Sequence, residues 1–410
     1  MTERYATPDR GTKDWHVPLN ENFNKLDEHV EVRDADSNKD DYTPKSGAKF
    51  LATDTGAVYL GDGSSWNQIG TIAPSTDGGS GQVSDGSVVA APGEVQSTID
   101  QYNAGFEWGP QPMQQIKLRS GEVYRPDSTW RIRSGTILEC NGAVIRPQGD
   151  FNVIEMERSA MVRRPAINCA DVSGYSSAAI VIQAPDSDKA GTPNPAHVYD
   201  CHVFNNQNTG VGVRFLGDQT PVSMQFASGK IHNFDRGLEF RARGSGTGSQ
   251  DGWCNGNWFN GNINGSRIPI YLISENGSPV GGNTVRAQIQ TSDQTEWIVR
   301  QEDAPADDTN LRENTYIIHP WDTFSMSNEY SEPDDNNAPI WYIGRGQQGG
   351  NKMWSTVGAF TNEHIINKAT VGRDRNDVFT GTRFKSGAID WLSGEHSFQV
   401  NDSVSYHPRS

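Results

Sequence analysis

The sequence contains no long apolar run. No segment approaches the roughly 18 consecutive apolar residues that a membrane-spanning helix needs, so we expect a soluble chain that does not insert into membranes. The N-terminal segment also lacks the apolar stretch, about 7–15 residues long, of a secretory signal. A role outside the cell therefore predicts another route of release, such as virion release at lysis.

Cysteine is scarce as well. The 410 residues include only Cys140, Cys169, Cys201 and Cys254, and no two of them form a CxxC pair. This argues against the common zinc-binding patterns. We therefore expect neither a metal ion nor a cofactor.

Positive charge, and lysine in particular, is in short supply. The chain has 24 Arg and only 11 Lys against 32 Asp and 19 Glu, which gives a net charge of −16. Such a field repels phosphate backbones, so nucleic acid is not an expected partner. The Asp-rich, Lys-poor balance is typical of proteins from high salt, and an ordinary acidic protein is the alternative interpretation.

Glycine and aromatic residues, in contrast, are plentiful. The chain has 43 Gly, 15 Phe and 11 Trp, which predicts a folded, turn-rich, all-β protein. At about 100–200 residues per domain, the length predicts two to four domains.

Residues 1–39 predict a helical attachment segment. Within the range 14–34, apolar side chains four, three and four positions apart form one stripe of a helix that opens at Pro18. The stripe consists of Leu19, Phe23, Leu26 and Val30. A single apolar stripe must pack against another apolar surface. That surface belongs either to its own domain or to another chain, as in a short parallel bundle or a docking peg.

Residues 40–72 predict a small β-meander in which short β-rich runs alternate with tight turns. The runs are 49–52, 57–60 and 66–69. Turn chemistry explains the cluster of Asp54, Asp62 and Gly63, since it lacks the six to eight oxygen ligands of a calcium site.

Beyond a small, polar linker at 73–93, repetition is the main signal. Strands that begin at Asn257, Asn283 and Asn314 recur at intervals of roughly 30 residues, and a second strand follows each. Units of this length cannot bury their own apolar faces and must stack on one another. The pattern predicts a parallel β-helix over 94–345.

Stacked turns place equivalent positions on the same face. We therefore predict that Asn257, Asn283 and Asn314 form a structural ladder of side-chain hydrogen bonds. The in-phase cysteines predict stacked interior side chains, with a disulfide between turns as the lesser alternative. Residues 346–410 depart from the spacing and predict a separate C-terminal β domain.

The sequence resembles known families in two places. A short helix at Glu94–Tyr102, followed by β-rich runs up to Ile182, resembles the first turns of pectin-lyase-like right-handed parallel β-helices, and the fit covers about 94–345. The segments Asn20–Leu26 and Ala52–Trp66 look like the virion-proximal parts of tail fibre and tail spike proteins.

Together these resemblances imply a tail spike or tail fibre of a virus of halophilic archaea. They imply a homotrimer in the virion, whose N-terminus joins other tail or baseplate proteins and whose β-helix attaches to a host surface glycan or surface-layer glycoprotein. A polysaccharide depolymerase, either a glycoside hydrolase or a lyase, on the same scaffold is the alternative.

No catalytic residue is assigned from the sequence. Asp235 and Glu239 are four positions apart in an extended segment, about 13 Å if fully extended, which is too far for a hydrolytic carboxylate pair. Glu275, one turn later, can approach them, but solvated surface charge is the simpler interpretation. No Gly-x-Ser-x-Gly elbow is present.

Aromatic residues crowd the distal half of the chain and suggest a surface for sugar rings. We single out Trp253 and Trp321 as receptor-binding candidates. For the other aromatic residues of this region we expect burial; these are Trp258, Tyr271, Trp297, Tyr316, Trp341 and Tyr342.

Overall fold

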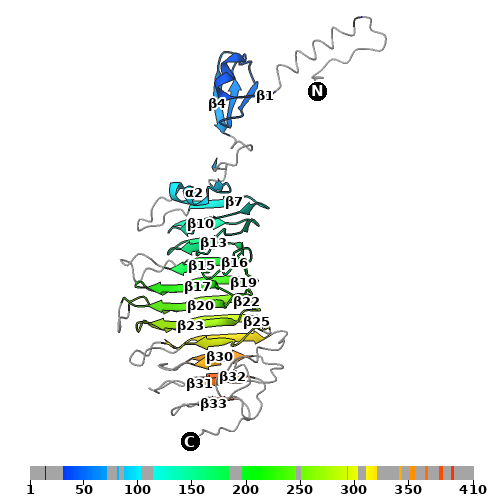
Figure 1. Ribbon diagram of the computed structural model, residues 1–410. Coiled ribbons are helices and arrows are strands. Elements are labelled where there is room, and N and C mark those ends of the chain that lie inside the picture. Colours follow the sequence, from blue (N-terminus) through cyan, green and yellow to red (C-terminus); the bar gives the residue numbers. More distant parts are fainter. Residues whose placement is uncertain are drawn as a thin grey trace, which may run out of the picture. The chain divides into compact units, whose positions relative to one another are not determined.

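The computed structural model contains two compact units, Met1–Gly86 and Ser87–Ser410. The described residues are 14, 31–71, 81–82, 87–102, 114–183, 196–245, 251–292, 294–302, 311–320, 341–343, 351–355, 365–367, 378–381 and 389–391. Almost all of their regular structure is β (Figure 1).

The first unit contains a four-stranded sheet in the order β1-β2-β3-β4. Its strands are β1 (Glu31–Asp34), β2 (Lys49–Ala52), β3 (Ala57–Gly61) and β4 (Trp66–Thr71), and a 3-10 helix, η1 (Asp36–Asp41), follows β1. Phe50 is fully buried against the rings of Tyr42, Tyr59 and Trp66. The three antiparallel strands confirm the expected meander.

Strand β1 was not expected. It pairs in parallel with β2, so the helix predicted over 14–34 is wrong for its C-terminal end, Glu31–Asp34. An amphipathic pattern fixes where apolar side chains repeat, but pairing with a strand further along the chain is a tertiary contact that the pattern does not contain. The predicted stripe from Leu19 to Val30 lies outside the described residues.

The turns of the first unit use their aspartates as hydrogen-bond acceptors. The Asp62 carboxylate accepts from the backbone and hydroxyl groups of Ser64 and Ser65 and from Asn67, at 2.7–2.8 Å. These bonds hold the pKa of Asp62 well below its usual value. The bonds account for Asp62 as turn chemistry, and the described residues contain no group of three or more His, Cys, Asp or Glu able to hold a metal ion.

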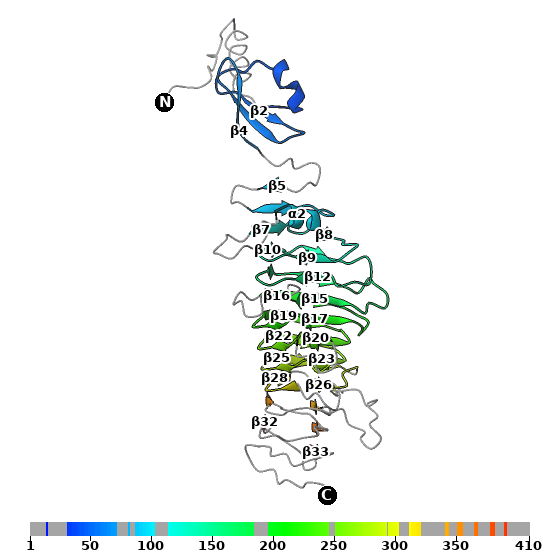
Figure 2. The ribbon, with the colours of Figure 1, turned by 90° about the vertical axis from the view of Figure 1, so that its left-hand side faces the viewer.

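The second unit is a right-handed parallel β-solenoid of about seven turns, as expected (Figures 1 and 2). It begins with the short helix α2 (Val95–Tyr102), whose Val95 and Ile99 are buried in the core and which packs against the first strands. Part of the expected linker is β-structure, because β6 (Val88–Ala90) pairs in parallel with the first solenoid strand. A further short strand, β5 (Gly81–Gln82), lies in the same linker.

Three parallel sheets run along the solenoid, and we name them sheets I, II and III. Sheet I contains β7 (Gln114–Leu118), β10 (Thr136–Glu139), β13 (Met161–Arg163), β16 (His197–Phe204), β19 (Phe226–His232), β22 (Trp258–Asn264), β25 (Thr284–Gln290), β28 (Thr315–Pro320), β30 (Lys352–Ser355) and β32 (Val378–Gly381). The short strands β8 (Val123–Tyr124), β11 (Val144–Ile145) and β14 (Ala166–Asn168) join it at the side.

Sheet II contains β9 (Trp130–Ile132), β12 (Ile154–Met156), β15 (Ala178–Gln183), β17 (Val211–Asp218), β20 (Arg236–Arg243), β23 (Ile268–Glu275), β26 (Val299–Gln301), β29 (Trp341–Ile343), β31 (Ile365–Asn367) and β33 (Ile389–Trp391). Sheet III contains β18 (Val222–Ser223), β21 (Cys254–Asn255), β24 (Val280–Gly281) and β27 (Leu311–Arg312). Side chains that alternate along the strands fill the interior with one continuous apolar core.

The four cysteines lie in this interior, as expected, and all are free thiols. The alternative of a disulfide between turns is therefore wrong. Burial raises the pKa of Cys169 and Cys201 to about 12, so both are small apolar side chains without thiolate character at neutral pH.

The described strands beyond residue 346 extend the solenoid. Strand β30 pairs in parallel with β28, and β31 pairs in parallel with β29. The pairing then continues to β32 and β33. A domain boundary at 346 is therefore not visible in the sheets, and the rest of 346–410 lies outside the described residues.

Candidate functional site

The asparagines predicted to form a ladder lie directly before strands of sheet I and are buried. The Asn257 amide Nδ2 donates to Asn283 Oδ1 at 3.0 Å, and Asn283 Nδ2 donates to Asn314 Oδ1 at 3.0 Å. A fourth member, Asn351, accepts from Asn314 Nδ2 at 3.3 Å. The sequence signal for Asn351 was its place before the short apolar run that becomes β30.

At its other end the ladder reaches Gln225. The Gln225 backbone N–H donates to Asn257 Oδ1 at 3.1 Å, and the Gln225 carbonyl accepts from the Trp258 N–H at 2.8 Å. The Gln225 side chain accepts from the Ala196 N–H. One chain of hydrogen bonds thus fixes the starts of β16, β19 and β22 against one another.

The residue after each of these positions points outward, because side chains alternate along a strand. In register these are His197, Phe226 and Trp258, one on each of three neighbouring strands. We call them the aromatic column. Trp258 is 58% exposed, and so large an exposed indole is unusual on a strand that also supplies the core.

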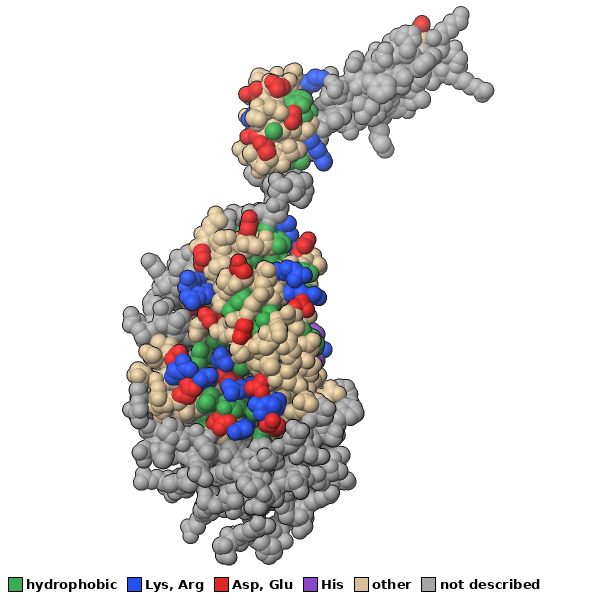
Figure 3. Space-filling model, viewed as in Figure 1, with side chains coloured by type: hydrophobic (Ala, Val, Ile, Leu, Met, Phe, Trp, Pro, Cys, Tyr) green, Lys and Arg blue, Asp and Glu red, His purple; other side chains and the backbone are tan. Residues whose placement is uncertain are grey.

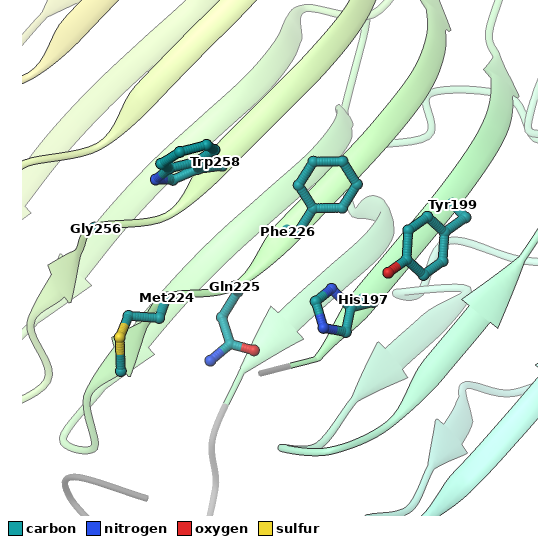
Figure 4. Close-up of a pocket in the computed structure, with 7 residues that line it drawn as sticks. All are labelled: His197, Tyr199, Met224, Gln225, Phe226, Gly256 and Trp258. Carbon is teal, nitrogen blue, oxygen red and sulfur yellow. The ribbon is translucent and has the colours of Figure 1, made fainter. Parts of the chain in front are cut away.

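The aromatic column lines an open groove of about 510 Å³ (Figure 4). Its lining residues are His197, Tyr199, Met224, Gln225, Phe226, Gly256 and Trp258. Tyr199 stacks on His197 with ring centroids 5.5 Å apart and also lies 5.6 Å from the Phe226 ring. His197, Tyr199 and Phe226 thus form one cluster of rings, and Trp258 lies on the next strand.

Chemically the groove offers apolar faces with a few polar groups. Burial lowers the pKa of His197, which keeps its imidazole neutral at pH 7. Within the described residues the His197 Nδ1 atom is buried without a hydrogen-bond partner. Exposed apolar patches with scattered polar groups mark binding surfaces, so we take this groove as the candidate site.

Of the two residues singled out from the sequence, Trp253 does not line this groove. Trp253 is 39% exposed, but it precedes β21 and is not among the lining residues. Trp321 lies outside the described residues. The expectation of burial is wrong for Trp258, and it is confirmed for Tyr271, Trp297 and Tyr316. The side chains of Trp341 and Tyr342 also lie outside the described part of the chain.

A signal for Trp258 was present in the sequence. It follows a ladder asparagine directly, and the ladder side chain points inward, so the next residue must point outward. The expectation of burial rested on the place of aromatic residues in apolar runs, whereas their place relative to the ladder decides which way they point.

The carboxylates considered for catalysis belong to the strands and turns of sheet II, and each is held by arginines. Glu239 is fully buried, with Oε1 2.5 Å from Arg214 Nε and Oε2 2.6 Å from Arg236 Nη1. Asp235 lies 2.5 Å from Arg267 Nε. Glu275 binds Arg241 and lies 2.7 Å from Arg243 Nε.

The charges of this network set the ionisation of Glu239. Burial acts to raise its pKa, but the charges of Arg214 and Arg236 outweigh burial and hold the pKa below its usual value. An ionised carboxylate between two guanidinium groups is a poor general acid, which needs a raised pKa. The arrangement ties three strands of sheet II together.

Comparisons of this chain with models of known protein families, with curated proteins and with solved structures found no match. No helix in the described part of the chain is long and apolar enough to cross a membrane. The class of protein defined by the geometry is a right-handed parallel β-helix with an exposed aromatic groove on one sheet.

Proposed function

We propose that this protein is a virion tail spike or tail fibre that attaches to the host cell surface through its β-helix. Its ligand is a surface glycan or the glycan of a surface-layer glycoprotein. The observation that supports attachment is the aromatic column of His197, Phe226 and Trp258 along the open groove of sheet I.

Sugar rings suit this surface. Their C–H faces pack on aromatic rings, and neighbouring strands about 4.8 Å apart repeat the aromatic platform at a spacing close to one sugar unit. The His197 ring is itself part of this platform, because it stacks on Tyr199. A glycan chain laid across the strands therefore meets one ring after another.

The proposed assembly is a homotrimer in the virion. The N-terminal unit joins other tail or baseplate proteins, and the host is a halophile. Support for these parts of the proposal comes from the sequence resemblance and from the net charge of −16.

A polysaccharide depolymerase is the alternative. We favour attachment because Asp235, Glu239 and Glu275 are each committed to arginine partners. Catalysis by a carboxylate pair would require one of them to be released from its partners and protonated.

The test is adhesion of purified protein to host envelopes, with Trp258→Ala as the variant. A bound glycan that covers half of the indole removes about 100 Å² of apolar surface from water, which contributes about 2.5 kcal/mol to the binding free energy. We therefore expect the variant to adhere ten- to a hundredfold more weakly. Ile69→Ala is the control, because Ile69 is also 58% exposed but belongs to the first unit.

Unchanged adhesion in Trp258→Ala would refute the groove as the attachment site. The alternative function, a polysaccharide depolymerase, would be favoured by a different result. In that result the protein releases reducing ends from envelope glycan, and a single carboxylate substitution abolishes the release while binding persists.

A further inference from the structure

The outer face of sheet I differs in charge from the rest of this acidic chain. Apart from Asp200, none of the outward-facing residues in the described strands β16, β19, β22, β25 and β28 is acidic. Amide side chains such as Asn260 and Asn262 occupy several of these positions. On sheet II, in contrast, acidic and basic side chains are interspersed and paired (Figure 3).

Basic residues flank the groove at both ends. Beside the aromatic column runs a second column of register partners, in which Arg163 pairs with Tyr199 on one side. On the other side Ser228 pairs with Asn260, and Asn260 pairs with Arg286. Arg163 thus lies one strand before the groove and Arg286 one strand after it.

Neither arginine makes an ion pair within the described residues, although the register partner of Arg163 on β10 is Glu139, whose carboxylate binds Arg164. Within the described residues Arg286 is exposed and makes no ion pair, and the Nε of Arg163 donates only to the Met161 sulfur, at 3.1 Å. Lys230, on β19 in the same face, is also exposed without an ion pair in the described part of the chain. Elsewhere on the solenoid, arginines such as Arg214 and Arg267 have carboxylate partners.

We propose that the glycan bound in this groove is anionic, with carboxylate or sulfate groups held by Arg163 and Arg286. This inference rests on the proposed function of the groove. The two arginines stand four strands apart, about 19 Å at roughly 4.8 Å per strand, so a ligand of several sugar units reaches both. A guanidinium binds a carboxylate or sulfate through two parallel hydrogen bonds, while the aromatic column supports the rings between.

The absence of acidic side chains matters as much as the cations. A chain of net charge −16 repels an anionic polymer in general, so binding requires a face from which acidic residues are excluded. At 1 M salt the screening length is about 3 Å, so only cations in direct contact with the ligand contribute to affinity. Arg163 and Arg286 are placed to make such contacts.

The experiment uses matched ligands in isothermal titration calorimetry at constant ionic strength. One pair is a hyaluronan octasaccharide and its carboxyl-reduced form, in which the uronates are neutral sugars. The second pair is a heparin octasaccharide and a neutral derivative of it, which is desulfated, N-acetylated and carboxyl-reduced. We expect the native member of at least one pair to bind about tenfold or more tightly than its altered form, since a charge-assisted contact contributes that much.

The variants separate charge from stacking. Arg163→Gln and Arg286→Gln each lower the affinity for the preferred anionic ligand about tenfold and leave the affinity for its altered form unchanged. Trp258→Ala lowers the affinity for both the native ligand and its altered form. Lys49→Gln, which removes one exposed positive charge from the first unit, is the control and changes neither.

The outcomes distinguish the two proposals. If both members of each pair bind with equal affinity and Trp258→Ala abolishes binding, the proposal of an anionic ligand is refuted. The proposed function of glycan attachment is not refuted by that result. If none of these glycans binds, the anionic ligand is overturned as well. Adhesion to host envelopes that does not depend on Trp258 overturns the proposed function itself.

Discussion

Asn257 and Trp258 are consecutive residues whose side chains point in opposite directions: the Asn257 side chain is fully buried, and the Trp258 side chain is 58% exposed. The buried amide bonds to Asn283 on the next turn, and the exposed indole lines the groove. The element that holds the turns together and the surface of the candidate groove therefore both depend on the start of one strand, β22. Damage to the ladder is expected to reach the groove.

The first prediction follows from this link. Asn257→Ala removes the acceptor for the Gln225 N–H and one donor to Asn283, and leaves buried polar groups without partners. We expect a loss of about 2–4 kcal/mol in the free energy of unfolding, measured in urea. Asn260→Ala, at an exposed position on the same strand, should stay within about 0.5 kcal/mol. Equal stability of the two variants would contradict a structural role for the ladder.

The second prediction concerns Glu239. Glu239→Gln leaves the half-buried Arg214 without its carboxylate and leaves Arg236 with only Asp235, at 3.5 Å, so we expect a loss of about 3–5 kcal/mol at pH 7. Because the folded-state pKa of Glu239 lies below its ordinary value near 4.5, its stabilisation is present above that value and is lost as pH falls through the folded pKa. The gap between wild type and variant should therefore narrow in acid.

Melting curves between pH 7 and pH 2 measure that gap. Glu122→Gln, at an exposed position, is the matched control and should follow the wild type throughout. A gap of constant size at every pH would count against the ion-pair interpretation.

The third prediction separates recognition from turnover. Asp235→Asn and Glu239→Gln, in folded preparations, should leave adhesion to host envelopes essentially unchanged, because neither residue lines the groove. Purified wild-type protein should release no reducing ends. Trp253→Ala is expected to weaken adhesion less than Trp258→Ala, since Trp253 lies outside the groove.

The fourth prediction is homotrimerisation. Light scattering in high salt should give about three times the chain mass of 45.0 kDa. A stable monomer across the concentration range would remove the trimer from the proposed assembly.

The fifth prediction concerns salt. With a net charge of −16, self-repulsion grows as the screening length rises from about 3 Å at 1 M to about 30 Å at 0.01 M. Thermal melts should shift to lower temperature as salt is withdrawn. A melting temperature that is flat or rises at low salt would refute the adaptation to high salt.

The sequence predicted the β-helix, the capping helix and the asparagine ladder because each depends on spacing along the chain. The step from Asn257 to Asn283 spans one turn of the solenoid, so the sequence interval alone defines the turn. The burial of Glu239 was not predictable in this way, since Arg214 is paired to it only by the register between β17 and β20. The same holds for β1, whose partner β2 is a tertiary contact.

The aromatic column has one further consequence. His197, Phe226 and Trp258 occupy a single register line, and each turn of the solenoid adds one position to it. Duplication or deletion of one turn would therefore lengthen or shorten the ligand footprint by a single sugar-sized step while the core stays in register. Under the proposed function, gene segments that each encode one turn would act as units of ligand length, and ligand preference would change by recombination of whole turns rather than by point substitution.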